Sequence, residues 1–284
     1  MKISIVIPAH NEAVSLRSLL PELVRLYPDA EIIVVNDASD DDSEAVCRLH
    51  NVRVVSHKYQ QGNGSAIKTG ARHAAGDVLV FMDADGQHKP TDVAGLLAEI
   101  ESGFDMAVGA RSLDSHAGFA RLAGNVFYNR LASWMTGHKV LDLTSGFRAV
   151  HAARFREFIH MLPNGFSSPT TITMAFFRAG YSVAYIPITA LARTGKSHIR
   201  LFRDGLKFLL IIFRVTAFYS PLKLFFPLSA VFFATGLGYY FYTYITQERF
   251  TNMGALLFMT SILIFLIGLV SEQITFLIYL ERKK

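Results

Sequence analysis

Two carboxylates, Asp83 and Asp85, stand one residue apart at the end of the apolar run 78–82. A short continuous apolar run is typical of a central strand in a parallel sheet that is covered on both faces. Ligands of open α/β sheets bind beyond the carboxyl ends of the strands. With Gln87, the pair offers hard oxygen ligands to a divalent cation such as Mg²⁺ or Mn²⁺. Alone the pattern is weak, because Asp is also common in turns.

Two earlier apolar runs also end in polar clusters. The residues of these clusters that we consider as ligand contacts are Pro8, Ala9, Asn11, Glu12 and Asp37. Such residues also cap helices. Three strand ends of this composition on one sheet edge, however, are more than capping explains.

A fourth candidate is the glycine-rich segment 62–66, which opens a predicted helix. Gly64 would let the backbone approach a ligand beside a helix N-terminus, which favours anions. The segment is not a Walker loop, because no Gly-Lys-Ser/Thr follows, and it is not the dinucleotide fingerprint, which belongs after the first strand.

The elements that must position these residues alternate along the first part of the chain. The predicted strands cover residues 3–7, 31–35, 52–55, 78–82 and 106–108, and the predicted helices cover 12–26, 42–49, 65–74 and 92–101. This alternation predicts an α/β fold with right-handed crossovers and a mostly parallel sheet.

Composition adds a membrane-associated part. Of the 284 residues, 51% are hydrophobic, and the mean hydropathy of +0.30 is high for one soluble domain. The single cysteine, Cys47, excludes an internal disulfide and fits a reducing compartment. From Thr189 onward lie 11 of the 28 basic residues but only 4 of the 23 acidic ones. They alternate with apolar runs, which favours an anionic membrane surface over nucleic acid.

The tail is predicted to cross a membrane twice. Residues 225–245 and 253–271 are uncharged runs of about the length that spans the hydrocarbon core. Buried helices of a soluble domain are the alternative. Before them, residues 197–220 contain a predicted amphipathic helix whose basic stripe would face lipid phosphates, or else solvent. We therefore expect a domain at 1–196, a juxtamembrane segment at 197–220 and a membrane hairpin at 221–284. Glu272 would mark the membrane exit or a contact between the two helices.

The order of several short motifs along the chain resembles that of a known family. They are PAHNE, VVNDASDDD, GNGSAIKTGARHAAGD, DADGQH, VGAR, DLTSGFRA and ARTGKS. As an ordered set they resemble the inverting family 2 glycosyltransferases, in the branch that acts on polyprenyl phosphates and includes dolichyl-phosphate mannose synthases. The resemblance covers residues 1–200 closely and the tail more loosely. It implies a GT-A fold, a divalent cation (Mg²⁺ or Mn²⁺) and a nucleotide-diphospho-sugar donor, either a UDP- or a GDP-sugar.

The resemblance also implies roles for single residues on the donor side. Pro8, Ala9, Asn11 and Glu12 correspond to the nucleoside cradle, and Asp37 to an aspartate on the base or ribose. Gly64 is counted with these donor contacts. Asp83 would lie near the ribose and sugar, and Asp83, Asp85 and Gln87 would hold the metal at the diphosphate, with Asp85 taking part in catalysis.

On the acceptor side the resemblance implies a set of cations. Arg111, Arg121 and Arg148 are candidates for binding the acceptor phosphate, although any one arginine is commonly a surface residue. Arg193 and Ser197 match the late Arg-x-Gly-x-Ser pattern that would hold the reacting phosphates. Asp142 matches a carboxylate that acts as general base on neutral hydroxyls, but a phosphate acceptor is already nucleophilic. The role of Asp142, as base or as orienting group, stays open.

We therefore expect a multi-pass membrane enzyme that transfers a single sugar to a polyprenyl phosphate, because the Gln-x-x-Arg-Trp signature of polysaccharide synthases is missing. The catalytic domain and both termini are expected in the cytoplasm. A transferase acting on another lipid, such as diacylglycerol, and an inactive membrane scaffold of the same fold are the alternatives. No nucleic-acid module is expected, and a homo-oligomer is left open.

Overall fold

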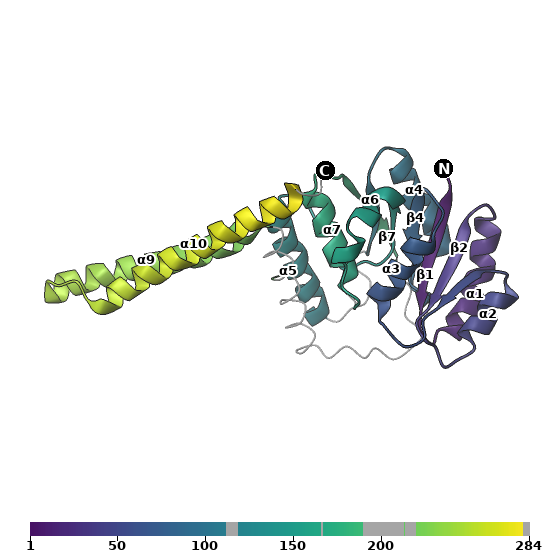
Figure 1. Cartoon of the computed structure of the whole chain (residues 1–284), viewed down its shortest axis with the longest axis horizontal. Coiled ribbons are helices and arrows are strands. Elements are labelled where there is room, and N and C mark those ends of the chain that lie inside the picture. The colour runs from purple at the N-terminus through teal and green to yellow at the C-terminus, as the bar shows by residue number, and fades with distance from the viewer. Residues whose placement is uncertain (112–118, 166, 190–212, 214–219, 281–284) are drawn as a thin grey trace. The chain divides into compact units, whose positions relative to one another are not determined.

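The computed structural model describes residues 1–111, 119–165, 167–189, 213 and 220–280, and the chain divides into two compact units, Met1–Phe208 and Leu209–Lys284 (Figure 1). The first unit is built on a seven-stranded sheet in the order β3-β2-β1-β4-β6-β5-β7. Its strands are β1 (Ile3–Ala9), β2 (Glu31–Asn36), β3 (Arg53–Ser56), β4 (Val78–Phe81), β5 (Met106–Arg111), β6 (Arg148–His151) and β7 (Val183–Ile188).

Helices link the strands and cover both faces of the sheet (Figure 1). They are α1 (Ala13–Leu26), α2 (Ser43–Leu49), α3 (Asn63–His73), the 3₁₀ turn Pro90–Asp92, α4 (Val93–Glu101), α5 (Phe119–Thr136), α6 (Ala152–Glu157), the 3₁₀ turn Ile159–Met161 and α7 (Ser168–Arg178). All nine elements predicted in the first 110 residues are confirmed, with boundaries that shift by at most three residues.

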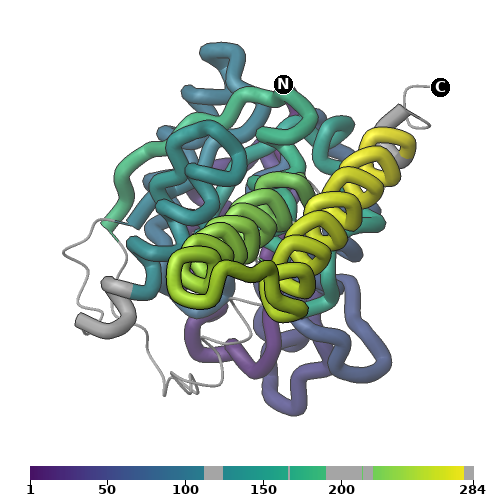
Figure 2. The backbone as a smooth tube through the Cα atoms, turned by 90° about the vertical axis from the view of Figure 1, so that its left-hand side faces the viewer, coloured from purple at the N-terminus to yellow at the C-terminus, as the bar shows by residue number. Residues whose placement is uncertain are grey.

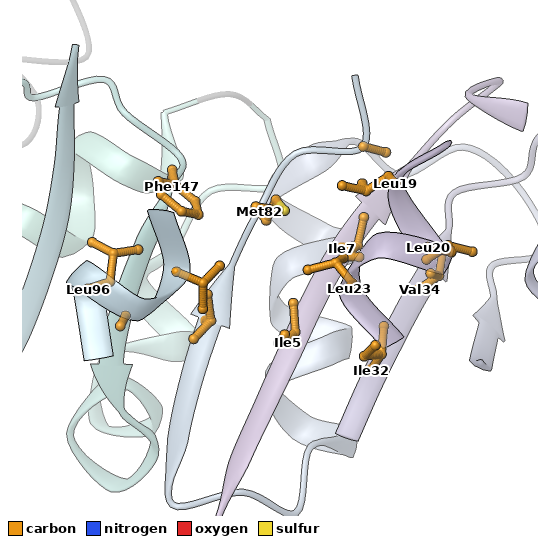
Figure 3. Packing of buried hydrophobic residues seen from close by; sticks show 14 of the residues in the cluster. Ile5, Ile7, Leu19, Leu20, Leu23, Ile32, Val34, Met82, Leu96 and Phe147 are labelled. Carbon is orange, nitrogen blue, oxygen red and sulfur yellow. The ribbon is translucent and has the colours of Figure 1, made fainter. Parts of the chain in front are cut away.

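Strand residues alternate between the two faces, as the two-residue period of a strand requires. Ile5 and Ile7 of β1 point to the face covered by α1 and α4, where they join a buried cluster that contains Leu20, Leu96 and Phe147 (Figure 3). Val6, between them, points to the other face, where Gly70 lets α3 approach closely. With both faces of β1 covered, its continuous apolar sequence is explained.

The sequence analysis predicted neither β6 nor β7, and it did not predict the direction of β6. β6 pairs antiparallel with both β4 and β5, whereas the other strand pairs are parallel. Because β6 runs the opposite way, its first residue lies at the edge where its neighbours end: Arg148 pairs with Phe81 and with Val108. The segment 142–147 therefore arrives beside the carboxyl end of β4.

The second unit contains two long antiparallel helices, α9 (Pro221–Gln247) and α10 (Asn252–Leu280), which lie side by side (Figure 2). Both are long and apolar enough to cross a membrane, with mean hydropathies of 1.5 and 2.5. They contain the predicted spans and extend beyond them. The predicted juxtamembrane helix at 197–220 lies almost wholly outside the described residues.

Small residues spaced by seven hold the two helices together. The buried positions in this pattern are Ser229, Gly236 and Thr243 of α9, and Gly254, Ser261, Gly268 and Thr275 of α10. A Cβ atom added to Gly268 would lie 2.6 Å from Cβ of Phe225, so the helices approach too closely for a larger residue there. The hydroxyls of Ser229 and Ser261 each donate to the backbone carbonyl of the other residue, at 3.0 and 2.9 Å. At one end, Glu272 accepts the N–H of Leu222 at 3.2 Å, which confirms the predicted contact between the helices.

This register predicts a cross-link. The two serine hydroxyl oxygens lie 3.1 Å apart, so cysteines in their places have side chains close enough for a disulfide. We expect Ser229→Cys with Ser261→Cys to lose both added thiols on mild oxidation, counted by a maleimide reagent after denaturation. Thr235→Cys with Ser261→Cys is the control, because Thr235 is exposed. Equal oxidation of the two pairs would contradict this register.

Candidate functional site

The turn after β4 brings Asp83 and Asp85 to the carboxyl edge of the sheet, as predicted. Gly86 within this turn has a φ of +72°, a backbone conformation that residues with a side chain rarely adopt. The N–H of Gln87 donates to Asp85 Oδ1 at 3.2 Å, and Asn63 from the start of α3 donates to Asp83 Oδ1 at 3.4 Å. The three predicted metal ligands are thus on one tight turn next to the helix that follows β3.

Gly146, in the segment that leads into β6, lies against the same carboxylate. A Cβ atom on Gly146 would be 2.9 Å from Asp83 Oδ2. A real side chain at this position would therefore displace either the segment or the carboxylate. The segment that leads into the antiparallel strand therefore packs directly against the Asp83 carboxylate.

Asp142 and Arg111 form a two-point ion pair at the same edge. Arg111 Nε donates to Asp142 Oδ2 at 2.8 Å and Nη2 donates to Oδ1 at 3.0 Å. Oδ1 also accepts the N–H groups of Thr144 and Ser145, each at 3.1 Å. Burial works to raise the pKa of Asp142, but the hydrogen bonds and charge of Arg111 outweigh it and hold the pKa below its ordinary value. Both oxygens are occupied, and a carboxylate in this state is a weak base.

The carboxylate turn and the ion pair form one electrostatic cluster. Burial works to lower the pKa of Arg111, but Asp142 raises it above its ordinary value, and Asp83 and Asp85 add to this effect. His88, stacked on Phe147 with ring centroids 4.8 Å apart, is buried beneath the turn. Burial lowers the pKa of His88 to about 4 despite the charge of Asp85, so its ring is neutral at pH 7.

A divalent cation fits the donor set of this turn. In the described part of the chain, no group of three or more His, Cys, Asp or Glu residues gathers as a metal cage would. Mg²⁺ commonly takes only one or two carboxylates and completes its shell with water and substrate phosphates. Asp83 and Asp85, with the amide of Gln87, are such a set of oxygen ligands.

The predicted nucleoside cradle is tied to the loop that follows β2. Asn11, at a φ of 57°, accepts the N–H of Asp40 at 2.8 Å and donates its own N–H to Ser39 at 2.9 Å. The N–H of Glu12 donates to Ser43 at 3.0 Å. Pro8 and Ala9 end β1 directly below. These bonds bring the first two polar clusters together, whereas the N-cap residues of α1 and α2, Glu12 and Asp42, make no side-chain capping hydrogen bond.

Asp37 is 3% exposed and binds protein groups with both oxygens. It accepts the N–H groups of Gln61 and Gly62 at 2.8 and 2.7 Å, and His57 Nδ1 lies 2.7 Å away. Burial works to raise its pKa, but these bonds lower it, so Nδ1 of His57 must carry the proton between them. The other ring nitrogen of His57 lies 2.9 Å from the hydroxyl of Thr69. The sequence analysis missed His57, because a single His after a strand gives no signal by itself.

The structure explains the glycine at position 64 by packing within the protein, not by the predicted approach of a ligand. A Cβ atom there would be 2.1 Å from the carbonyl oxygen of Pro163 and 2.2 Å from the hydroxyl of Ser168. The N–H of Ser65 already donates to the carbonyl of Asn164 at 3.1 Å. Gly64 therefore allows the segment before α7 to pack on the start of α3, so protein groups occupy the space that the sequence analysis assigned to a ligand.

Of the predicted phosphate-binding arginines, the structure describes the side chains of Arg111 and Arg148, and these two do not share one open surface. Arg148 is 2% exposed and points into the interior against α7, so it does not lie on an open acceptor surface. Arg121 is on α5, outside the residues whose side chains the structure describes, and Arg193 and Ser197 lie outside the described residues. Of the acceptor set, Arg111 is the one that the described structure places beside Asp83 and Asp85.

Named relatives are similar over most of the chain. A dolichyl-phosphate hexose transferase of Haloferax volcanii is 29% identical over 209 residues, which cover 72% of this chain and 89% of that protein. An undecaprenyl-phosphate mannosyltransferase of Micrococcus luteus is 29% identical over 217 residues, with coverage of 68% and 85%. A polyprenol monophosphomannose synthase of Mycolicibacterium smegmatis is 27% identical over 208 residues, with coverage of 66% and 77%.

Solved structures share the fold. Glucosyl-3-phosphoglycerate synthase of Mycobacterium tuberculosis, in complex with Mn²⁺, UDP and phosphoglyceric acid, aligns with a TM-score of 0.63 at 21% identity, covering 76% of this chain and 78% of that chain. The GT-A fold expected from the resemblance is therefore confirmed.

Family models match both units. The model described as "GtrB C-terminal hairpin" matches residues 220–277, which contain α9 and nearly all of α10. The model described as "Glycosyl transferase family 2" matches residues 4–159, more than half of the chain, from β1 to the end of α6. That match includes the carboxylate turn, the Arg111–Asp142 pair and the antiparallel strand that joins them, and it shows that the chain belongs to glycosyl transferase family 2.

Proposed function

We propose that this protein transfers a single sugar from a nucleotide-diphospho-sugar to a polyprenyl phosphate, with inversion at the anomeric carbon. The observation that carries the proposal is the meeting of Asp83 and Asp85 with the Arg111–Asp142 pair at one sheet edge. Three relatives are named as transferases or synthases of dolichyl, undecaprenyl or polyprenol phosphate sugars, which supports this acceptor class.

On the donor side, Asp83, Asp85 and Gln87 would hold a divalent cation. When bound, such an ion offsets the charge that develops on the departing nucleoside diphosphate. Neighbouring GT-A structures that contain Mn²⁺ or Mg²⁺ with UDP support its use here. Pro8, Ala9, Asn11, Glu12 and Asp37 would line the nucleoside site. Asp37 would support this site by holding the loop before α3, because both of its oxygens already accept hydrogen bonds from protein groups.

On the acceptor side, one phosphate oxygen would bond to the anomeric carbon as the bond to the nucleoside diphosphate breaks on the opposite face. Arg111 would hold the phosphate, with Arg121, Arg193 and Ser197 completing the site. Asp142 would act by fixing Arg111, because its oxygens are already occupied and its pKa is lowered. No general base is needed, since the second pKa of a phosphate monoester is about 6.

The direct test is a transfer assay in membranes. A panel of UDP- and GDP-sugars would be offered with polyprenyl phosphate, unphosphorylated polyprenol or diacylglycerol as acceptor. We expect product with polyprenyl phosphate alone. Product with diacylglycerol would favour a neutral-lipid transferase. Donor binding without transfer or hydrolysis on any acceptor would favour an inactive scaffold.

Arg193 provides a finer test of the acceptor. An arginine fork can hold two phosphate oxygens, which a lysine cannot reproduce. We expect Arg193→Lys to reduce the acceptor-dependent rate by about tenfold or more while nucleotide-sugar affinity changes little. Arg203→Lys is the control, since an anionic surface tolerates such an exchange. Equal, minor losses in both variants would refute a phosphate-binding role for Arg193.

Membrane orientation can be tested separately. Basic residues precede α9, and Arg282, Lys283 and Lys284 follow α10, against a single basic residue, Arg249, between the helices. This distribution predicts that both termini and the catalytic domain face the cytoplasm. A cysteine placed at Arg249 should react with an impermeant maleimide added to intact cells, and a C-terminal tag should be protected. The reverse pattern would overturn this orientation.

A further inference from the structure

Arg148 is a buried cation whose contacts with described residues are all to uncharged groups. Its Nη1 donates to the carbonyl of Pro169 and to the hydroxyl of Thr173, each at 3.2 Å, and its Nη2 contacts the carbonyl of Ser145. Its Nε is buried with no hydrogen-bond partner. Among the described residues, no carboxylate is within ion-pair distance of it. A buried charge without a partner is costly, so its retention calls for an explanation.

The opposite charges that act on Arg148 come from the functional site. Burial lowers the pKa of Arg148 to about 10, while Tyr185, Asp142 and Asp83 act against this effect. The guanidinium therefore stays protonated at neutral pH. Asp142 already has Arg111 as a close partner, whereas Asp83 is on the turn that also carries Asp85. Arg148 thus adds a buried positive charge that acts on Asp83 and Asp142 from the interior.

Arg148 also shapes the segment that presses on Asp83. At one end of this segment, Asp142 is fixed by Arg111 and accepts the N–H of Ser145. At the other end, Arg148 holds the carbonyl of Ser145 and anchors it to α7. Gly146 follows directly and faces the Asp83 carboxylate. One side chain therefore influences both the charge and the position of Asp83.

We infer that Arg148 is a positioning residue of the donor site. By offsetting the charge of Asp83 and Asp142 from the interior, it sets the balance between the affinity for the cation and the affinity for the diphosphate. This inference rests on the proposed function. It replaces the expectation that Arg148 contacts the acceptor phosphate. A fixed positive charge at this depth weakens the binding of a free cation and strengthens the binding of a free anion, because water screens it little.

The test measures these two affinities separately on the full-length protein by isothermal titration calorimetry. The probes are Mn²⁺ alone, and UDP and GDP in the absence of metal. We expect Arg148→Gln to bind Mn²⁺ about three to ten times more tightly and the nucleotide about three to ten times more weakly. Arg148→Lys keeps the charge and should leave both affinities near wild type. Both variants should lower the unfolding temperature, because each loses hydrogen bonds to α7 and Ser145.

A second variant keeps the test decisive if Arg148→Gln does not fold. Thr173→Asp puts a carboxylate beside Nη1 of Arg148 and neutralises its charge with the guanidinium still in place. Like Arg148→Gln, it should strengthen the binding of Mn²⁺ and weaken the binding of the nucleotide. Arg156→Gln is the control, because Arg156 also donates to two backbone carbonyls, those of Ala71 and Ala74, but is exposed on α6.

Two outcomes would overturn the inference. If Arg148→Gln and Thr173→Asp both bind Mn²⁺ and the nucleotide more weakly than wild type does, Arg148 has only a structural role. If neither affinity changes, its charge does not reach the site. Wild-type protein that bound neither probe would instead refute the donor site, and with it the proposed function.

Discussion

Replacing Asp85 with alanine is expected to lower the sugar-transfer rate on the order of a hundredfold or more. The change removes one of two carboxylates that would hold the cation and leaves the charge on the departing diphosphate without its main compensation. The turn itself should survive the loss of the hydrogen bond from the N–H of Gln87, because Gly86 keeps its left-handed backbone conformation. The measurement is initial rate in membranes at saturating donor, with Mn²⁺ affinity determined alongside.

Asp42→Ala is the matched control. Asp42 also follows a strand at this edge, but its side chain is 78% exposed and pairs only loosely with Arg17, at 3.6 Å. Its removal should change the rate by less than about twofold, since exposed ion pairs contribute little. A wild-type rate that survives exhaustive chelation, together with an active Asp85→Ala protein, would rule out the metal-assisted mechanism.

Adding a single methyl group at Gly146 is expected to reduce the transfer rate by about tenfold to a hundredfold. The new Cβ atom would lie 2.9 Å from Asp83 Oδ2, closer than such atoms normally come. Asp83 must then turn away from the cation and the donor, or the segment before β6 must move. Small displacements of a positioned group have large kinetic effects, so the loss in rate should exceed the loss in stability.

Gly165→Ala separates this contact from the general effect of replacing a loop glycine. A Cβ atom on Gly165 would meet no atom within 4 Å, and its φ is not in the left-handed region. We expect a rate within about twofold of wild type and unchanged or slightly raised stability, because alanine reduces the entropy of the unfolded chain. If Gly146→Ala kept full activity and Mn²⁺ affinity, the close contact with Asp83 would have no functional importance.

The sequence by itself predicted the features that depend on local pattern. Alternating apolar runs and helical segments placed nine elements in the first 110 residues, because period and length directly reflect which face of each element is buried. The two apolar tail runs predicted α9 and α10 by their length, since about 20 uncharged residues match the thickness of a bilayer. The carboxylate turn was also visible, because Asp83 and Asp85 directly follow a buried strand.

Only the tertiary structure decided what depends on contacts between distant segments. β6 has four residues and begins with a charge, so no local pattern revealed that it would insert antiparallel between β4 and β5 and bring Gly146 to Asp83. The same holds for His57, whose role is defined by Asp37 and Thr69, and for Gly64, whose missing side chain makes room for Pro163. Arg148 resembled a surface phosphate ligand in the sequence. Pairing with Phe81 and Val108 put it in the interior instead, because a position inside the sheet is determined by strand order, and strand order is not encoded in any single segment.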